Sequence, residues 1–369
     1  MTDPILAIGL MSGTSRDGID AAVLRSDGEG VIEAGDWLTA PYDEGFRARL
    51  AGVIGGRGDV PAVERELPLR HADAVRRLLR SAGLGAGDVR LCGFHGHTIL
   101  HEPRAGRTWQ IGDGALLAAE TGIDVVADFR SADMAAGGEG APLAPLFHAG
   151  LARDLGRPIA VLNVGGVANV TWIGPPASGG ETPALLAFDT GPGNALSDDW
   201  AQRHTGRPID EDGALARAGR VDEPALAALL DHAYFARPAP KSLDRDDFAI
   251  APMSHLAPAD GAATLIAFTA AAVARAASWF PAPAARWLVT GGGRRNPVLM
   301  QALAERLGAP VAAVEAVGWQ GDALEAQAFA YLAVRSRRGL PLSLPGTTGV
   351  ARPVTGGRFF ARPGQSERG

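Results

Sequence analysis

The strongest constraint on this fold is a set of short apolar runs that end at or near glycine, aspartate or histidine. The runs lie at residues 5–10, 89–94, 123–127, 159–164, 185–188 and 286–290. Buried β-strands have this appearance, because both of their faces are covered and functional groups collect at their ends. The sequence therefore predicts several buried strands with polar groups at their termini.

Helical patterns alternate with these runs. They lie at residues 114–121, 195–205, 223–234, 262–278, 297–307 and 323–338. The pattern at 297–307 has Asn296 as its cap, Pro297 at its first position and Gly308 after its end, which is typical of a complete helix. Strands interleaved with helices predict an α/β fold class.

The composition favours a soluble enzyme of two domains. The 369 residues exceed one ordinary core, and a hydrophobic content of 46% is enough to fill two. The net charge of −6, without any block of Lys or Arg, predicts no nucleic-acid partner and no binding to an anionic membrane. Residues 1–10 have no basic segment and lead into a glycine-rich turn, so we expect no signal peptide, no transmembrane span and a cytoplasmic location. A single cysteine, Cys92, excludes a disulfide framework.

A small, hydroxyl-rich turn follows the first apolar run. It begins at Ser12 and Gly13 and continues through Thr14 and Ser15 to Asp17. Backbone N–H groups without large neighbouring side chains can close on phosphate oxygens, and an acidic residue can hold the accompanying cation. The turn is therefore a candidate phosphate loop of a nucleotide site. The pair Asp-Gly at residues 17–18 is equally typical of an ordinary β-hairpin.

Two further glycine turns follow apolar runs, at residues 162–169 and 288–297. Taken singly, each is also typical of a tight connection between a strand and a helix. Together with the turn at 10–15 they predict two related halves that each present a phosphate-facing turn to a nucleotide. The candidate contacts are Asn163, Gly165, Gly166 and Asn169 for a triphosphate, and Gly291, Gly292 and Gly293 for a base or ribose. No GxxxxGKS/T sequence occurs, which excludes a Walker-type ATPase.

Asp189 is the strongest candidate for a general base. The apolar run 185–188 ends at this aspartate, and a rigid turn of sequence TGPGN follows, up to Asn194 at the start of a helix. The strand fixes the carboxylate while the glycines leave room for a substrate beside it. An aspartate that merely caps the turn is the structural alternative.

Polar side chains follow two of the other runs. His95, His97 and His101 lie close together, but no further histidine or carboxylate cluster completes a metal site, so this segment favours hydrogen bonding to a sugar. Arg130 lies after a later run and can orient a carboxylate or phosphate through two hydrogen bonds. An ion pair of Arg130 with a neighbouring aspartate is the alternative.

Several segments, in order along the chain, closely resemble those of the anhydro-N-acetylmuramic acid kinase family. They read GLMSGTSRDGID, FHGHTILHEP, IGDGALLA, VVADFRSADMAAGGEGAPLAP, LNVGGVANVT, FDTGPGNALSDDW, TGGGRRNP and DALEAQAFAYLAVRSRRGLPLSLPGTTG. The resemblance covers about residues 6–355. It implies the two-domain sugar kinase, actin and heat-shock chaperone fold, with ATP in an interdomain nucleotide cleft, Mg²⁺ as cofactor and a homodimer.

This resemblance also implies a division of the chain. We expect an N-terminal domain over residues 1–135, with the phosphate loop and the sugar-side residues. A C-terminal domain over residues 136–369 would carry the second phosphate turn, Asp189 and the adenosine turn. Its C-terminal segment can pack back on the first domain.

The reaction that the resemblance implies is unusual for a kinase. The substrate, 1,6-anhydro-N-acetylmuramic acid, is hydrolysed at its anomeric carbon and phosphorylated on its 6-oxygen, which gives N-acetylmuramic acid 6-phosphate and ADP in cell-wall recycling. Asp189 would deprotonate the attacking water, and Asp17 would lie near Mg²⁺. The sugar-side residues would be His97, Thr98, Arg130 and Glu325. The ATP contacts would be Ser12, Gly13, Thr14, Ser15, Arg16, Asp17, Gly18, Ile19, Asp20, Asn163, Gly165, Gly166, Asn169, Gly291, Gly292, Gly293 and Asn296.

Two positions depart from the family pattern. The family usually has HGQT where this chain reads HGHT at residues 95–98, so His97 replaces a glutamine that would hydrogen-bond the sugar. We therefore expect sugar affinity to weaken as the pH falls through the imidazole pKa of about 6.5. The stretch 241–253 keeps the Lys-Ser opening but lacks the usual Thr-Gly, which leaves its role open.

Two other functions fit the same fold. An ordinary sugar or acid kinase of this superfamily would phosphorylate a free hydroxyl without hydrolysis. A nucleotide-dependent binding module would bind ATP without sugar-stimulated turnover, because a fold alone does not decide function. A product assay with the anhydro sugar separates these possibilities.

Overall fold

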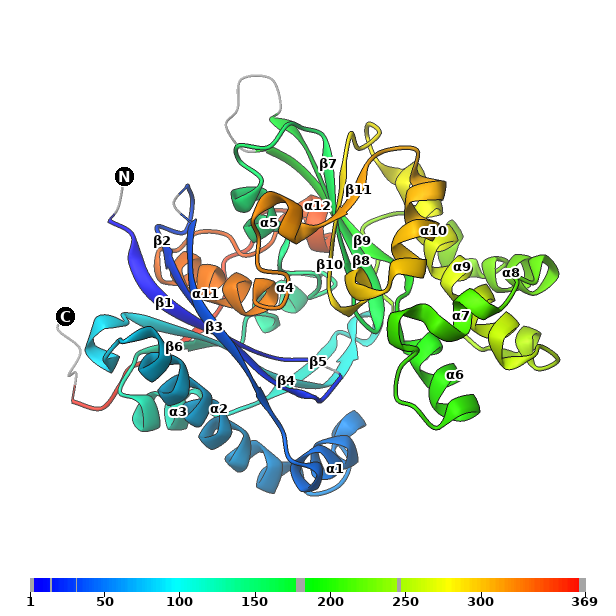
Figure 1. Cartoon of the computed structure of the whole chain (residues 1–369). Coiled ribbons are helices and arrows are strands. Elements are labelled where there is room, and N and C mark those ends of the chain that lie inside the picture. The colour runs from blue at the N-terminus through cyan, green and yellow to red at the C-terminus, as the bar shows by residue number, and fades with distance from the viewer. Residues whose placement is uncertain (1–2, 14, 31, 177–182, 244–246, 365–369) are drawn as a thin grey trace. The chain divides into compact units, whose positions relative to one another are not determined.

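The computed structural model describes residues 3–13, 15–30, 32–176, 183–243 and 247–364. The chain forms two compact α/β units (Figure 1): residues 1–154 with 323–369 make unit 1, and residues 155–322 make unit 2. The predicted α/β class is confirmed. The boundary expected after residue 135 falls inside unit 1, to which the C-terminal segment also belongs.

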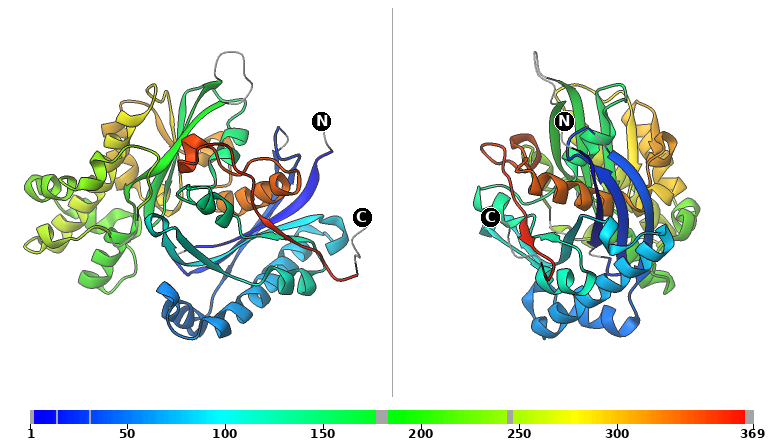
Figure 2. Two further views of the ribbon diagram at one scale, coloured as in Figure 1. Left: turned by 180° about the vertical axis from the view of Figure 1, so that it is seen from behind. Right: turned by 90° about the vertical axis from the view of Figure 1, so that its left-hand side faces the viewer.

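Unit 1 is built on a mixed sheet. Over the described residues this sheet has seven strands, in the order β12-β6-β4-β1-β2-β3, with β5 paired to β4. Strands β1, β4 and β6 are parallel, and the others run antiparallel to their neighbours. In Figure 2 the red C-terminal strand β12 lies beside β6. The strands are β1 (Ile5–Ser12), β2 (Gly18–Ser26), β3 (Ile32–Pro41), β4 (Leu91–Glu102), β5 (Arg107–Ile111), β6 (Val125–Ala127) and β12 (Arg358–Phe360).

Helices cover both faces of this sheet, with α2 and α3 on one side and α11 on the other (Figure 1). The long helix α2 begins after Asp59, whose carboxylate accepts the Ala62 N–H, and ends at Gly83 in the left-handed conformation. Its apolar face packs with Ile8 and Leu10 of β1 in one core. The helices of unit 1 are α1 (Glu44–Gly52), α2 (Val60–Ala82), α3 (Gly114–Thr121), α4 (Ser131–Ala135), α5 (Pro145–Leu151), α11 (Leu324–Arg337) and α12 (Pro345–Thr348).

Helix α11 touches the backbone of the central strands. A β carbon added at Gly9 of β1 would lie 1.8 Å from the carbonyl oxygen of Ala326, and one added at Gly93 of β4 would lie 2.1 Å from that of Phe329. Real side chains never approach a carbonyl so closely, so glycine is required at both positions. This contact is the physical reason that the C-terminal helix returns to the N-terminal sheet.

Unit 2 repeats the topology of unit 1. Over the described residues its sheet has five strands in the order β11-β10-β7-β8-β9. Strands β7, β10 and β11 are parallel, whereas β8 and β9 are antiparallel, just as in the order β6-β4-β1-β2-β3 of unit 1. The shared order agrees with the two related halves expected from the glycine turns. The strands are β7 (Ile159–Val164), β8 (Val167–Pro176), β9 (Pro183–Pro192), β10 (Trp287–Thr290) and β11 (Val311–Ala313).

Helix α9 is the central helix of unit 2 and contacts four other helices and β9. The segment Pro258–Trp279 is long and apolar enough to cross a membrane by length and composition, but 72% of its most apolar part is buried within the protein. A core helix has the same properties, so the segment by itself does not argue for a membrane span. The helices of unit 2 are α6 (Ala195–Thr205), α7 (Ala214–Ala218), α8 (Glu223–Leu230), α9 (Pro258–Ala276) and α10 (Pro297–Leu307).

The close approach of α11 predicts a large effect of one methyl group. Gly9→Ala should lower the free energy of unfolding by about 1–3 kcal/mol or more, because the helix backbone must move away from the sheet. The matched control is Gly52→Ala in α1, where nothing lies within 4 Å of the added carbon. Urea denaturation of both variants measures the difference, and a Gly9→Ala variant as stable as the parent would contradict the described packing.

Candidate active site

One row of polar residues crosses the sheet of unit 2. Thr290, Asn163, Asn169 and Asp189 are successive partners across β10, β7, β8 and β9. Directly paired residues project from the same face of a sheet, so these four side chains lie side by side. The residues that flank the row belong to the apolar core on the opposite face: Leu162, Val164, Val170, Phe188 and Val289. The structure thus places the predicted base in line with two predicted phosphate contacts.

The glycine turns at the ends of these strands touch each other. The Gly193 N–H donates to the Gly166 carbonyl oxygen (2.9 Å), and a β carbon on Gly193 would lie 2.2 Å from the carbonyl oxygen of Gly165. A β carbon on Gly291, whose φ is +75°, would lie 2.3 Å from Oδ1 of Asn163. The two later turns of the sequence analysis therefore converge with the turn that follows Asp189.

The remaining candidates of the third turn differ in exposure. Gly292 is exposed, whereas Gly293 is buried against Val164, which a β carbon would approach to 2.6 Å. Asn296 caps α10, as its position in the sequence predicted, and its side-chain oxygen accepts two N–H groups of the first turn at 3.0 and 3.2 Å. This oxygen is therefore already used in the helix cap.

Backbone and hydroxyl groups from distant segments surround Asp189. The Leu243 N–H donates to Oδ2 of the carboxylate (2.8 Å), and the Asp189 N–H donates to the Lys241 carbonyl oxygen (2.9 Å). The hydroxyl of Tyr234 donates to the Asp189 carbonyl oxygen. The half-buried carboxylate is thus held by segments that follow it by about fifty residues.

The first candidate turn lies in a hairpin of unit 1. Strands β1 and β2 pair antiparallel, and within the turn the Arg16 N–H donates to the Gly13 carbonyl oxygen (3.0 Å). The Ser15 hydroxyl donates to Oδ1 of Asp17 (2.7 Å), and both side chains are exposed. Thr14 lies outside the described residues. The segment thus lies in a hairpin, but Gly18 of the Asp-Gly pair already belongs to β2 and pairs with β3 rather than forming the turn. The role of the segment as a phosphate loop stays a prediction.

The later residues of this segment are more enclosed. Gly18 and Ile19 are buried, and a β carbon on Gly18 would lie 2.6 Å from the Ala40 carbonyl oxygen. The Thr39 hydroxyl donates to Oδ1 of Asp20 (2.6 Å). Gly18 is therefore needed for strand pairing, whatever the turn binds.

The described residues contain no group of three or more His, Cys, Asp or Glu side chains that could hold a metal ion. Mg²⁺ at nucleotide sites usually takes only one or two carboxylates and fills its remaining positions with phosphates and water. The exposed carboxylate of Asp17, in a turn rich in hydroxyl groups, fits such a partial ligand set.

Ser12, Tyr42 and His97 form a buried polar cluster at the end of β1. The Ser12 hydroxyl oxygen lies 2.8 Å from the Tyr42 hydroxyl and 2.9 Å from Nδ1 of His97, whose side chain is fully buried. Burial lowers the pKa of His97 to about 4, and the nearby charge of Arg16 acts in the same direction. The expected titration at about pH 6.5 is therefore wrong. This imidazole stays neutral because water does not reach it.

Arg130 fixes the tautomer of a second buried histidine. It donates from Nε (3.2 Å) and Nη2 (3.0 Å) to Nε2 of His95, and from Nη1 to the Gly140 carbonyl oxygen (2.7 Å). A guanidinium only donates, so Nε2 of His95 accepts and its Nδ1 carries the proton, which points to the Gly96 carbonyl oxygen (3.0 Å). Burial and the charge of Arg130 hold the pKa of His95 well below its usual value.

The other two sugar-side candidates also belong to unit 1. Thr98 is half-buried in β4, and its hydroxyl oxygen accepts a bond from Nε2 of Gln110 on β5 (3.2 Å). Glu325 is exposed in the first turn of α11. The structure thus places His97 and Thr98 on β4, Arg130 directly before α4 and Glu325 on α11, all within unit 1.

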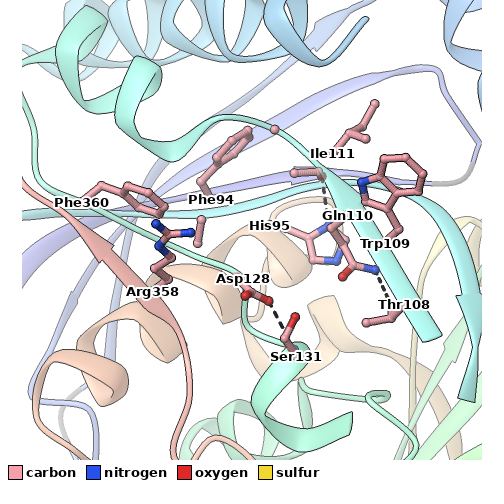
Figure 3. A pocket seen from close by; sticks show the side chains of 13 residues that line it. Phe94, His95, Thr108, Trp109, Gln110, Ile111, Asp128, Ser131, Arg358 and Phe360 are labelled. Atoms are coloured by element: carbon pink, nitrogen blue, oxygen red, sulfur yellow. Dashed lines mark hydrogen bonds between the residues drawn. The ribbon is translucent and has the colours of Figure 1, made fainter. Parts of the chain in front are cut away.

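A pocket of about 200 Å³ lies beside the hydrogen-bond partners of two of these residues (Figure 3). His95 and Gln110, the partners of Arg130 and Thr98, both line it. Figure 3 shows Arg358 and Phe360 of β12 at one end and the Asp128–Ser131 hydrogen bond below. The lining residues are Phe94, His95, Gly96, Thr108, Trp109, Gln110, Ile111, Gly112, Ala127, Asp128, Ser131, Arg358 and Phe360.

Sequence reasoning missed the residues that hold Asp189. Tyr234 and Leu243 carry no local signal, because each acts through one contact to a residue far away in the sequence. Lys241 did carry a signal, since it is the only lysine of the chain.

The family profile and the sequence relatives of this chain agree on one family. The profile of a family described as anhydro-N-acetylmuramic acid kinase matches residues 5–362. The anhydro-N-acetylmuramic acid kinase of Paramagnetospirillum magneticum is 60% identical over 357 residues, which cover 96% of this chain and 99% of the relative. That of Rhodospirillum rubrum is 58% identical over 361 residues, 96% of this chain and 94% of the relative. Among solved structures, the activator of the 2-hydroxyisocaproyl-CoA dehydratase from Clostridium difficile, with bound ADPNP, is similar at 12% identity and a TM-score of 0.48, covering 91% of this chain and 96% of that one.

The low pKa of His97 predicts a loss of stability in acid. An unfolded histidine binds its proton at about pH 6.5 and the folded His97 only at about 4, so stability falls as the pH drops between these values. Because of this linkage, the free energy of unfolding should fall by about 2 kcal/mol between pH 7 and pH 5. Urea denaturation at pH 7 and pH 5 measures the free energy of unfolding. Between these pH values it should fall by about 2 kcal/mol less in His97→Gln than in the parent. The exposed His204→Gln serves as control, and an unchanged pH dependence in His97→Gln would contradict the burial.

Proposed function

The chain belongs to the anhydro-N-acetylmuramic acid kinase family, and we propose from this premise that it opens 1,6-anhydro-N-acetylmuramic acid by hydrolysis and phosphorylates its 6-oxygen with ATP. The products are N-acetylmuramic acid 6-phosphate and ADP, and the reaction belongs to the recycling of the bacterial cell wall. The relatives give no support to an ordinary sugar kinase that leaves the ring closed.

One carboxylate is enough for this reaction. Water attacks the anomeric carbon and gives its proton to Asp189, while the bond from the anomeric carbon to the 6-oxygen breaks. The 6-oxygen forms a bond to the γ-phosphorus as the bond to ADP breaks. The phosphoryl group thus takes the place that a general acid holds in an inverting glycosidase.

The observation that best supports this assignment is the setting of Asp189. The half-buried carboxylate stands in one row with Asn163 and Asn169, beside glycine turns whose backbones touch. The Leu243 N–H fixes the plane of the carboxylate through Oδ2. A general base needs such a fixed orientation, together with access to the substrate, and this carboxylate is only half-buried.

The roles of the other residues follow the family pattern. We propose that residues 12–20 and the turns at 163–169 and 291–296 contact ATP, and that Thr98, Arg130 and Glu325 contact the sugar. Asp17 would hold Mg²⁺, which neutralises charge on the phosphate oxygens when it is bound. His97, a buried and neutral imidazole whose Nδ1 lies beside the Ser12 hydroxyl, would also contact the sugar, as the family pattern implies. A homodimer, which the resemblance implies, and a cytoplasmic location, which the sequence composition indicates, stay predictions.

Removal of the base should abolish most of the turnover. Asp189→Asn keeps the shape and can still accept the Leu243 N–H, but it cannot take a proton, so kcat should fall by about 10²–10⁴. Mass spectrometry of the phosphorylated sugar measures kcat, and calorimetry with a non-hydrolysable ATP analogue should show unchanged nucleotide affinity. Asp231→Asn, which removes an exposed carboxylate of the same unit, is the control. If Asp189→Asn turns over at the parental rate, Asp189 is a structural residue.

A further inference from the structure

We propose that Lys241 is a positioning residue for Asp189: its ammonium group anchors the segment 241–243, and the backbone of this segment holds the catalytic carboxylate. The inference rests on the proposed function in that it takes Asp189 as the base. It also gives a role to the Lys-Ser opening of the stretch 241–253, which the sequence left open.

Three hydrogen bonds tie Asp189 to the neighbourhood of Lys241. The Asp189 N–H donates to the Lys241 carbonyl oxygen (2.9 Å), and the Leu243 N–H donates to Oδ2 of Asp189 (2.8 Å). The Tyr234 hydroxyl donates to the Asp189 carbonyl oxygen. A shift of segment 241–243 would therefore move both the main chain and the carboxylate of Asp189.

The ammonium group of Lys241 closes this network. The side chain is only 3% exposed, and Nζ donates to the carbonyl oxygen of Tyr234 at 3.1 Å. Nζ also lies 4.5 Å from the ring centroid of Tyr234, 5.6 Å from that of Trp279 and 5.9 Å from that of Phe188. A desolvated cation among aromatic rings gains a cation–π interaction. Lys241, Tyr234 and Asp189 thus form a closed ring of contacts.

The choice of lysine at this position is informative. Lys241 is the only lysine of the chain, and all the other residues among its 35 Lys and Arg are arginine. A guanidinium is a wide planar fork, whereas an ammonium is a compact point charge on a flexible stem. A compact cation suits a small space between three rings, and the exclusive use of arginine elsewhere makes the exception at residue 241 significant.

The charge of Lys241 is poorly solvated. Burial lowers its pKa to about 8, and the neighbouring positive charge of Arg237 acts in the same direction. Among the described residues, Arg237 and Tyr234 are the charged or titratable groups that face this ammonium. Arg237 lies 5.4 Å from the Tyr234 ring and donates to the Ser242 carbonyl oxygen (3.4 Å). The ammonium is mostly protonated at pH 7 and loses its cation–π contacts above pH 8.

Two variants separate the charge from the packing. Lys241→Met keeps the length without the charge, and kcat should fall by about 10–100-fold because a misplacement of the base by about 1 Å has this effect. The KM for the sugar and the affinity for an ATP analogue should stay within about threefold, since Lys241 touches neither ligand in this proposal. Lys241→Arg restores a cation and should recover part of kcat. Arg306→Met, which removes an exposed cation of the same unit, is the control.

The pH profile of kcat tests the role of the charge itself. The parent should lose turnover above about pH 8, whereas Lys241→Arg should show no such loss, because a guanidinium stays charged to pH 12. A parental kcat in Lys241→Met, or the same alkaline loss in Lys241→Arg, would overturn the proposal.

A measurement on the unchanged protein covers the case in which the variants do not fold. With lysine labelled by ¹³C at Cε, the chain gives a single side-chain NMR signal from Lys241. Its titration midpoint should lie at about pH 8 and coincide with the alkaline loss of kcat. A midpoint near the ordinary value of about 10.5 would show that the ammonium is not enclosed and would overturn the proposal. A parent that makes no phosphorylated sugar would instead refute the proposed function, so the two failures are distinct.

Discussion

Direct contact between backbones at glycine positions is the constraint on which both units depend. In unit 1, helix α11 reaches the sheet only because Gly9 and Gly93 carry no β carbon. In unit 2, the turns around Asp189 pack against each other only because Gly193 and Gly291 carry no β carbon. A β carbon there would collide with the carbonyl oxygen of Gly165 or the side-chain oxygen of Asn163. Glycine loses much conformational freedom on folding, so such positions are costly unless close approach is needed. The site residues are therefore placed by backbone contacts before any ligand binds.

Much of the local structure could be predicted from the sequence. The helices at 114–121, 195–205 and 297–307 have the predicted limits, because caps and glycines mark their ends. The long helix α2 was missed, although Asp59 and Gly83 mark it in the same way. The extent of unit 1 could not be predicted from local patterns, since the return of α11 depends on its contact with strands more than two hundred residues earlier.

The candidate site shows the same division between local and long-range information. The turns and Asp189 could be read from residue types, but their common row depends on strand register, which a single segment does not specify. The pKa of His97 depends on burial, so the value of an exposed imidazole was a wrong starting point. The contacts of Asp189 with Tyr234 and Leu243 join segments far apart in the sequence, so no local sequence pattern predicts them.

The central claim is that Asp189 directs water to the anomeric carbon while the phosphoryl group goes to the 6-oxygen. The position of the water oxygen in the product tests this claim most directly. The protein, the anhydro sugar, ATP and Mg²⁺ are incubated in oxygen-18 water, and the product is fragmented in a mass spectrometer. The proposed reaction places one label on the anomeric hydroxyl and none in the phosphate. A label in the phosphate, or a phosphorylated sugar whose anhydro ring is still closed, would contradict it.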